Sequence, residues 1–196
     1  MDYNGGMNIG EFYTPEKTSI ITLLSQVEVK VLNLFKRKKD LPNTTFGKVK
    51  LFGRRWSTSV KASITLWGKE YSLNCILIAE KEHPEINQGQ EDVFRRFTQN
   101  SSYISKGVER IVADYFGTND AALLTSKFGP YELMISPNAE CAIVANNADD
   151  EEMDDVLPGL AVVIYPKMAI FTEEDYSEYV LFSGSDEIKA ELYGGE

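Results

Sequence analysis

The first part of the chain carries the pattern of an amphipathic helix. Apolar residues recur every three or four positions across residues 20–34, after a Thr-Pro-Glu helix start at residues 14–16. The run KRKK that follows places positive charge where the carboxyl end of a helix favours it. The pattern predicts a helix over residues 14–39, although the segment VEVKV at 27–31 also alternates like a strand.

From Phe46 onward the pattern becomes that of β-strands. Three β-rich runs, FGKVKLF, SVKASITLW and EYSLNCILIA, follow one another. Residues 67–70 (WGKE) separate the last two runs. Gly68 at the first central position predicts a type II′ hairpin. The polar residues 80–89 are expected to form a loop.

The middle of the chain returns to helical spacing, and its last part to strands. Helices are predicted over residues 90–99 and 103–116, followed by a short helical turn in AALLTSK. Five further strands are predicted in YELMIS, ECAIVAN, GLAVVIYP, MAIF and EYVLF. The charged segment after Ser183, which contains Gly194-Gly195 near its end, is predicted to be a peripheral tail.

This order, strands first, helices next and strands last, is not the regular alternation of a βαβ protein. It predicts an α+β fold with an antiparallel or mixed sheet and the helices packed on one face. The expected organisation is an N-terminal extension with one helix (1–42), an α+β domain (43–183) and a peripheral tail (184–196).

Composition is that of an ordinary globular protein, with 43% hydrophobic and 26% charged residues in 196. Cys75 and Cys141 both lie in strand-like apolar runs and are expected to be buried, reduced thiols. A bridge between them stays open if their strands are neighbours. No apolar run is long enough for a transmembrane helix, and the polar N-terminus has no signal-peptide core. These features predict a cytoplasmic protein.

Charge is divided unevenly along the chain. Residues 1–128 carry a formal net charge of +4, whereas residues 129–196 carry −14. The acidic part would repel phosphates, which argues against nucleic-acid binding. It favours a basic protein partner, or serves only solubility.

The densest acidic run is the main candidate site. It consists of six carboxylates predicted to bind a partner: Asp149, Asp150, Glu151, Glu152, Asp154 and Asp155. Three interpretations remain: a solvated connection, a patch that faces a partner, or a cation site. The run lacks the glycine that a calcium loop needs at its sharp turn.

Residues for bond-making chemistry are scarce. The single histidine, His83, lies in a polar loop sequence without partners at metal-ligand spacing. The chain contains no phosphate-binding glycine motif and no nucleophile elbow. Arg54, Arg55 and Trp56 resemble the cation–aromatic mixture of single-strand binders, but read more simply as an exposed corner. No catalytic residue, metal or cofactor is predicted.

Three short motifs resemble a family of small bacterial domains of unknown function. The family has an F-G-x-[VL] strand, an L-[WF]-G-K-E-Y hairpin, two helices, an acidic loop and a G-L-A-V strand. Phe46-Gly47, residues 66–71 and residues 159–162 match these marks, and the resemblance covers residues 46–182. Leu157-Pro158 stands where the family usually has Glu-His, so no role of that histidine is carried over. Members lack an established activity, and some are similar to toxin-immunity or accessory proteins.

Two classes of function follow from these patterns. The first is a non-catalytic binding protein, of the toxin-immunity or accessory type, that uses an acidic C-terminal surface. The alternatives are a hydrolase that uses paired carboxylates, or a structural protein with no specific ligand. The helix at 14–39 would pack on the domain, join two copies into a dimer, or lie on a membrane surface.

Overall fold

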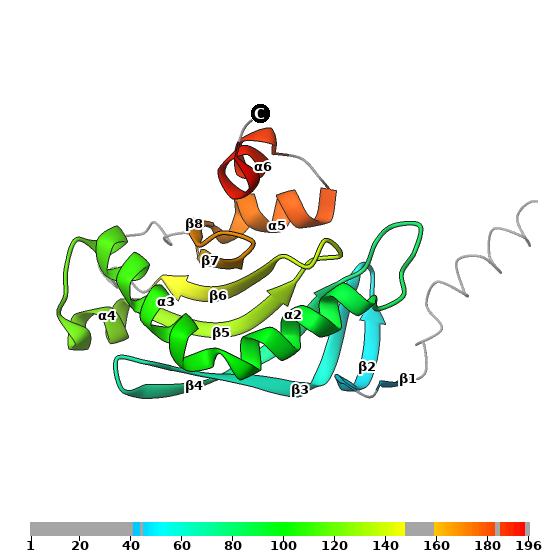
Figure 1. Ribbon diagram of the computed structural model, residues 1–196, viewed down its shortest axis with the longest axis horizontal. Coiled ribbons are helices and arrows are strands. Elements are labelled where there is room, and N and C mark those ends of the chain that lie inside the picture. Colours follow the sequence, from blue (N-terminus) through cyan, green and yellow to red (C-terminus); the bar gives the residue numbers. More distant parts are fainter. Residues whose placement is uncertain (1–40, 44, 148–158, 183–184, 195–196) are drawn as a thin grey trace, which may run out of the picture. The chain divides into compact units, whose positions relative to one another are not determined.

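The computed structural model describes residues 41–43, 45–147, 159–182 and 185–194, all within one unit, Lys39–Glu196. Its sheet has eight strands that lie in the order of the sequence (Figure 1). The strands are β1 (Leu41–Asn43), β2 (Gly47–Phe52), β3 (Arg55–Leu66), β4 (Lys69–Ile78), β5 (Phe128–Ile135), β6 (Cys141–Asn147), β7 (Leu160–Tyr165) and β8 (Ala169–Thr172). The helices of the described residues are α2 (Gln88–Gln99), α3 (Ser101–Phe116), α4 (Ala121–Lys127), α5 (Glu173–Phe182) and α6 (Asp186–Tyr193).

One strand pair differs from all the others in direction. β4 and β5 run parallel, whereas the remaining neighbours are antiparallel. A parallel pair cannot be joined by a tight turn, and here α2, α3 and α4 form the crossover between the two strands. The predicted α+β class with a mixed sheet is therefore confirmed.

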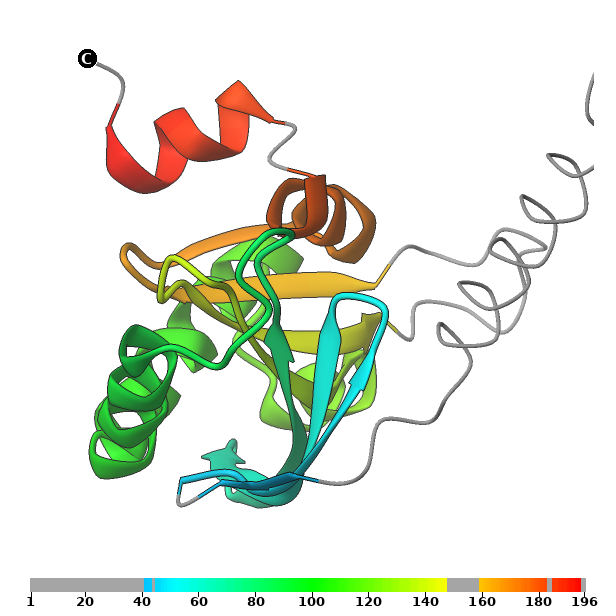
Figure 2. The ribbon, with the colours of Figure 1, turned by 90° about the vertical axis from the view of Figure 1, so that its right-hand side faces the viewer.

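Helices cover both faces of this sheet (Figure 2). On one face, residues of α2 and α3 such as Phe97 and Val108 share a core with Leu133 of β5. On the other face, α5 and α6 pack on the next residue of the same strand, Met134. The prediction of helices on one face was right for α2–α4 and wrong for the C-terminal pair. Strands β5–β7 are apolar at almost every position and so need cover on both sides.

The two C-terminal helices replace a predicted strand and a predicted tail. The segment EYVLF lies within α5, because Tyr176, Tyr179 and Val180 bury one face at helical spacing. Its aromatic and β-branched residues favour a strand locally, and packing on the sheet overrides that preference. The predicted peripheral tail contains α6, which buries Ile188 and Leu192.

The N-terminal predictions are only partly covered by the structure. The helix expected at 14–39, with its proposed dimer contact, lies outside the described residues. Leu41–Asn43, at the expected boundary between the N-terminal extension and the domain, forms the short edge strand β1, where a proline is tolerated. None of the described helices has the length and apolar character needed to cross a membrane.

The β3–β4 hairpin is confirmed, but its turn type is not the predicted one. Leu66 pairs with Lys69, so Trp67 and Gly68 are the two central residues. Both have positive φ, 48° and 78°, which is the pattern of a type I′ turn. The N–H of Trp67 donates to Glu109 Oε1 of α3 at 2.5 Å. This contact helps to hold a bulky residue in the left-handed region.

A buried glutamine ties the crossover to the parallel strands. Gln90, in the first turn of α2, is 1% exposed. Its Nε2 donates to the carbonyl oxygens of Ile78 (2.9 Å) and Ile135 (3.3 Å), at the ends of β4 and β5. Its Oε1 accepts from the N–H of Asn87, which completes a capping box at the start of α2.

Both cysteines are buried free thiols, as the sequence predicts. Burial raises the pKa of Cys75 from 9.0 to about 12, against the smaller opposing effect of its hydrogen bond with Thr58. Burial also raises the pKa of Cys141 well above its usual value. Both groups stay protonated in the folded protein at pH values where the unfolded chain ionises.

Alkaline pH is therefore expected to destabilise the fold. Below about pH 9 the stability is unaffected by Cys75, because its thiol is protonated in both states. Between pH 9 and 12 only the unfolded state loses this proton, so Cys75 alone lowers the free energy of unfolding by about 1.4 kcal/mol per pH unit. Urea unfolding in reductant from neutral pH upward measures this slope. The Cys75→Ala variant should lose stability less steeply, and equal slopes would contradict the assignment.

Candidate functional site

The predicted partner-binding run lies outside the described residues. The description of the chain stops at Asn147 and resumes at Gly159, so it includes none of residues 149–155. The acidic C-terminal surface therefore has to be assessed from the acids of α5 and α6.

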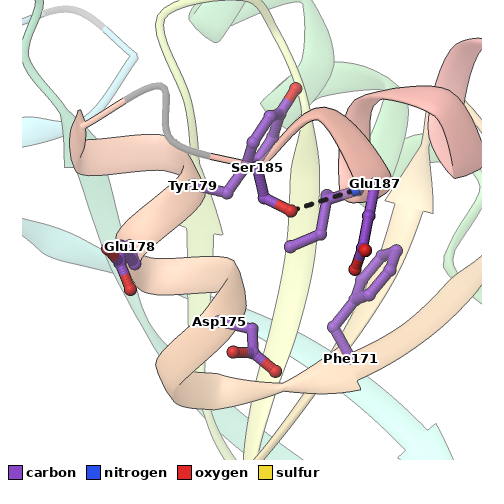
Figure 3. Close-up of a pocket in the computed structure, with 7 residues that line it drawn as sticks. Phe171, Asp175, Glu178, Tyr179, Ser185 and Glu187 are labelled. Carbon is purple, nitrogen blue, oxygen red and sulfur yellow. Dashed lines mark hydrogen bonds between the residues drawn. The ribbon is translucent and has the colours of Figure 1, made fainter.

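An acidic groove separates α5 from α6 (Figure 3). It has a volume of about 350 Å³ and is lined by Asp175 and Glu178 of α5 and by Glu187 of α6, with Phe171 of β8 as an apolar wall. Figure 3 shows Glu187 beside the Phe171 ring, with Asp175 across the groove. A groove with carboxylates around an aromatic ring suits a lysine or arginine side chain, which has an apolar stem and a cationic end.

Local helix chemistry accounts for part of this acidity. Glu173, Glu174 and Asp175 lie in the first turn of α5, and Asp186 and Glu187 in that of α6, where negative charge complements the helix dipole. Asp175 is also held in place, because Thr172 Oγ1 donates to its Oδ2 at 2.6 Å and accepts from its N–H at 3.1 Å.

The helices α5 and α6 carry more negative charge than these roles at the helix starts explain. The two helices carry seven carboxylates and one lysine, Lys189. Of the two acids outside the first turns, Glu191 pairs with Lys167 at 2.6 Å. Glu178 lines the edge of the groove and has no ion pair within the part of the chain that the structure describes. The surface thus keeps an uncompensated field that attracts cations.

A buried carboxylate anchors both helices to the sheet. Glu140 ends the β5–β6 turn and is 1% exposed. Its Oε1 accepts hydrogen bonds from the hydroxyl groups of Tyr179 in α5 and Tyr193 in α6, both at 2.7 Å. Burial, and then the hydrogen bond to Glu140, raises the pKa of each tyrosine above its ordinary value. Both phenols therefore remain donors at neutral pH.

A second cavity adjoins the groove on the other side of Tyr179 and Ser185. Its volume is about 330 Å³. Glu140 lines it together with Arg54 and Lys189, so buried and exposed charges of both signs share one cavity. Arg54 comes from the β2–β3 turn, and Lys189 from α6.

Arg54, Arg55 and Trp56 do not form the exposed corner that the sequence suggests. Trp56 is buried and donates from Nε1 to the carbonyl oxygen of Pro84 at 2.7 Å. Arg54 is half-buried, and its Nε donates to the carbonyl oxygen of Ala79 at 3.0 Å. With the aromatic ring in the core, no cation–aromatic platform for single strands is available at these residues.

Two carboxylates near β5, Glu132 and Glu173, influence one another by charge. Tyr131 donates from its hydroxyl to Glu173 at 3.0 Å, and Glu132 and Arg55 lie near enough to interact by charge. Burial raises the pKa of Glu132, the charge of Arg55 opposes the shift, and the charge of Glu173 adds to it. Neither carboxylate lines the groove or the adjoining cavity.

The described segments show neither a metal-binding cluster nor a buried histidine. They contain no cluster of histidine, cysteine, aspartate or glutamate suited to a metal ion. His83 is exposed in the loop before α2.

Sequence reasoning missed the Glu140 anchor for two reasons. Tyr179 was assigned to a strand and Tyr193 to a tail, so neither was expected near the β5–β6 turn. The only local signal was a glutamate directly before the apolar run CAIVA, where a charged residue has to be exposed or paired.

A scan of protein-family models found no match, and no curated protein or solved structure matched the chain. The resemblance to the bacterial domains of unknown function therefore stays a prediction from short motifs.

Proposed function

We propose that this chain is a non-catalytic binding protein that holds a basic protein partner against the acidic surface of α5 and α6. The groove between these helices carries the proposal, because three carboxylates line it together with an apolar wall. A basic side chain could bury its stem against Phe171 and place its cationic end among Asp175, Glu178 and Glu187.

The wider role follows the motif resemblance and the charge distribution. We take the protein to be bacterial and cytoplasmic, and to act as a toxin-immunity or accessory protein. The segment at 149–155 adds six further acids to the net negative charge of this part of the sequence. A nucleic-acid partner is disfavoured, because this field repels phosphates.

The test compares two variants that change the net charge equally. The groove variant carries Asp175→Lys, Glu178→Lys and Glu187→Lys; the control carries Glu82→Lys, Glu85→Lys and Asp114→Lys, at exposed positions elsewhere. Partners captured from native host lysate by the unmodified chain are identified, purified and titrated against all three proteins. We expect one basic protein whose affinity falls about 10- to 100-fold for the groove variant and little for the control.

Salt provides the second criterion. Binding should weaken as ionic strength rises, because screening shortens the reach of exposed charges. Equal loss in both variants, or retention that salt does not change, would contradict the proposal. If no protein is captured, the structural role without a specific ligand becomes the better interpretation.

A carboxylate-dependent hydrolase is the second candidate, favoured by the raised pKa of Glu132 beside Glu173. Such a pair could divide the roles of acid and base. Hydrolysis of a model ester or glycoside that Glu132→Gln abolishes would favour this function over binding.

A further inference from the structure

The cavity next to the acidic groove is lined by basic as well as acidic side chains, and the binding of a basic protein does not explain the basic ones. Among its lining residues are two cations, Arg54 and Lys189, and three carboxylates, Glu80, Glu140 and Asp186. At about 330 Å³ it lies at the small end of the range for small-molecule sites. A ligand that pairs with both the basic and the acidic side chains of this cavity has to carry a positive and a negative group.

Glu140 supplies the most constrained negative group in the cavity. Its Oε1 is occupied by Tyr179 and Tyr193, whereas its Oε2 makes no hydrogen bond among the described residues. Oε2 is not fully enclosed, so a ligand that enters the cavity can reach it. An ammonium group at this place would give the oxygen a charged donor.

The turn that carries Glu140 is held rigidly. The N–H of Ser136 donates to the carbonyl oxygen of Glu140 at 2.9 Å, and Ser136 Oγ accepts from the N–H of Glu140 at 3.2 Å. Asn87 Nδ2 adds a hydrogen bond to the carbonyl oxygen of Pro137 at 2.9 Å. Ala139 has a positive φ of 62°, a conformation that costs about 1 kcal/mol for a residue with a side chain. The carboxylate is therefore positioned before any ligand arrives.

Arg54 and Lys189 supply the positive groups of the cavity wall. The hydrogen bond from Arg54 Nε to Ala79 fixes the guanidinium and leaves its terminal nitrogens to donate elsewhere. Lys189 forms no hydrogen bond or ion pair through its ammonium group within the described residues. Both groups suit a carboxylate of the ligand.

We propose that this cavity binds a small zwitterion of the α-amino acid class. The ligand's ammonium group contacts Glu140 Oε2, and its carboxylate is held by Arg54 and Lys189. A simple cation would leave the two basic groups without a partner, and a simple anion would face three carboxylates. This site goes beyond the proposed partner surface and does not depend on it.

The test is isothermal titration calorimetry of the full chain with the twenty standard α-amino acids, one at a time. The tightest binder is then compared with its decarboxylated amine and its deaminated acid. We expect at least one amino acid to bind, and each single-charge analogue to bind at least about tenfold more weakly. Lys189→Ala should weaken the amino acid about tenfold and should not weaken the amine analogue, because only the amino acid has a carboxylate that the lysine can hold.

Lys61→Ala, at an exposed lysine of β3, is the matched control and should bind like the unmodified chain. Absence of binding by every amino acid at about 10 mM would overturn the proposal, as would an amine analogue that binds as tightly as its parent. If Lys61→Ala and Lys189→Ala weaken amino acid binding equally, the change in net charge explains the effect, and the proposal is overturned. The groove variant should keep amino acid binding, so the two proposals can fail separately.

Discussion

Substitution of Glu140 by alanine is expected to lower the free energy of unfolding by about 3 kcal/mol, because two hydrogen bonds to a charged group are lost together. The loss should concentrate in the C-terminal helices, since the partners of Glu140 are Tyr179 of α5 and Tyr193 of α6. Urea unfolding gives the total effect. Hydrogen exchange should show lost protection across Asp186–Tyr193 before the sheet is affected.

Single-atom changes separate this anchor from general packing. Tyr193→Phe keeps the ring and removes the donor, and should cost about 1–2 kcal/mol. Its effect should largely vanish in the Glu140→Ala background, because the interaction is already gone. Glu191→Ala, at an exposed carboxylate of the same helix, should cost less than about 1 kcal/mol. If Glu140→Ala costs no more than Glu191→Ala, the buried carboxylate is not the anchor.

Gln90→Ala is expected to lower the free energy of unfolding by about 2–4 kcal/mol. The substitution leaves the carbonyl oxygens of Ile78 and Ile135 without their amide donor, in a place where water does not reach. It also removes half of the capping box at the start of α2. Denaturant unfolding measures the loss.

Two further variants test the mechanism of this effect. Gln90→Glu keeps the size of the side chain but cannot donate when ionised, so it should be at least as destabilising as Gln90→Ala. Gln88→Ala removes an exposed amide whose contact is Asp92 on the same helix, and should change stability by less than about 0.5 kcal/mol. A well-tolerated Gln90→Glu would show that helix packing, and not donation to the two strands, is what matters.

Local periodicity predicted most of the sheet and the crossover helices. The strands from Phe46 to Ile78 and the helices around Phe97 and Val108 have one buried side each, and their apolar spacing records it directly. The later strands were also identified, since long apolar runs with few charges admit few alternatives.

Features that depend on tertiary context were not predictable in the same way. EYVLF has strand-like composition, and only the apolar face of β6–β8 decides that it forms a helix. The same holds for Glu140, whose tyrosine partners lie 39 and 53 residues away in sequence. The count of charges along the sequence showed that the C-terminal part is acidic. It did not show that many of these acids lie in the first turns of two helices that flank a groove.

The parallel pairing of β4 with β5 also affects how the chain folds. On either side of it, β3 meets β4 and β5 meets β6 through short turns, so those contacts close small loops at little entropic cost. The pair β4–β5 joins segments that are separated by three helices, so its formation closes a much longer loop at a greater entropic cost. If the strands β1–β4 and the strands β5–β8 each pair first, the rate of folding depends on how fast β4 then pairs with β5.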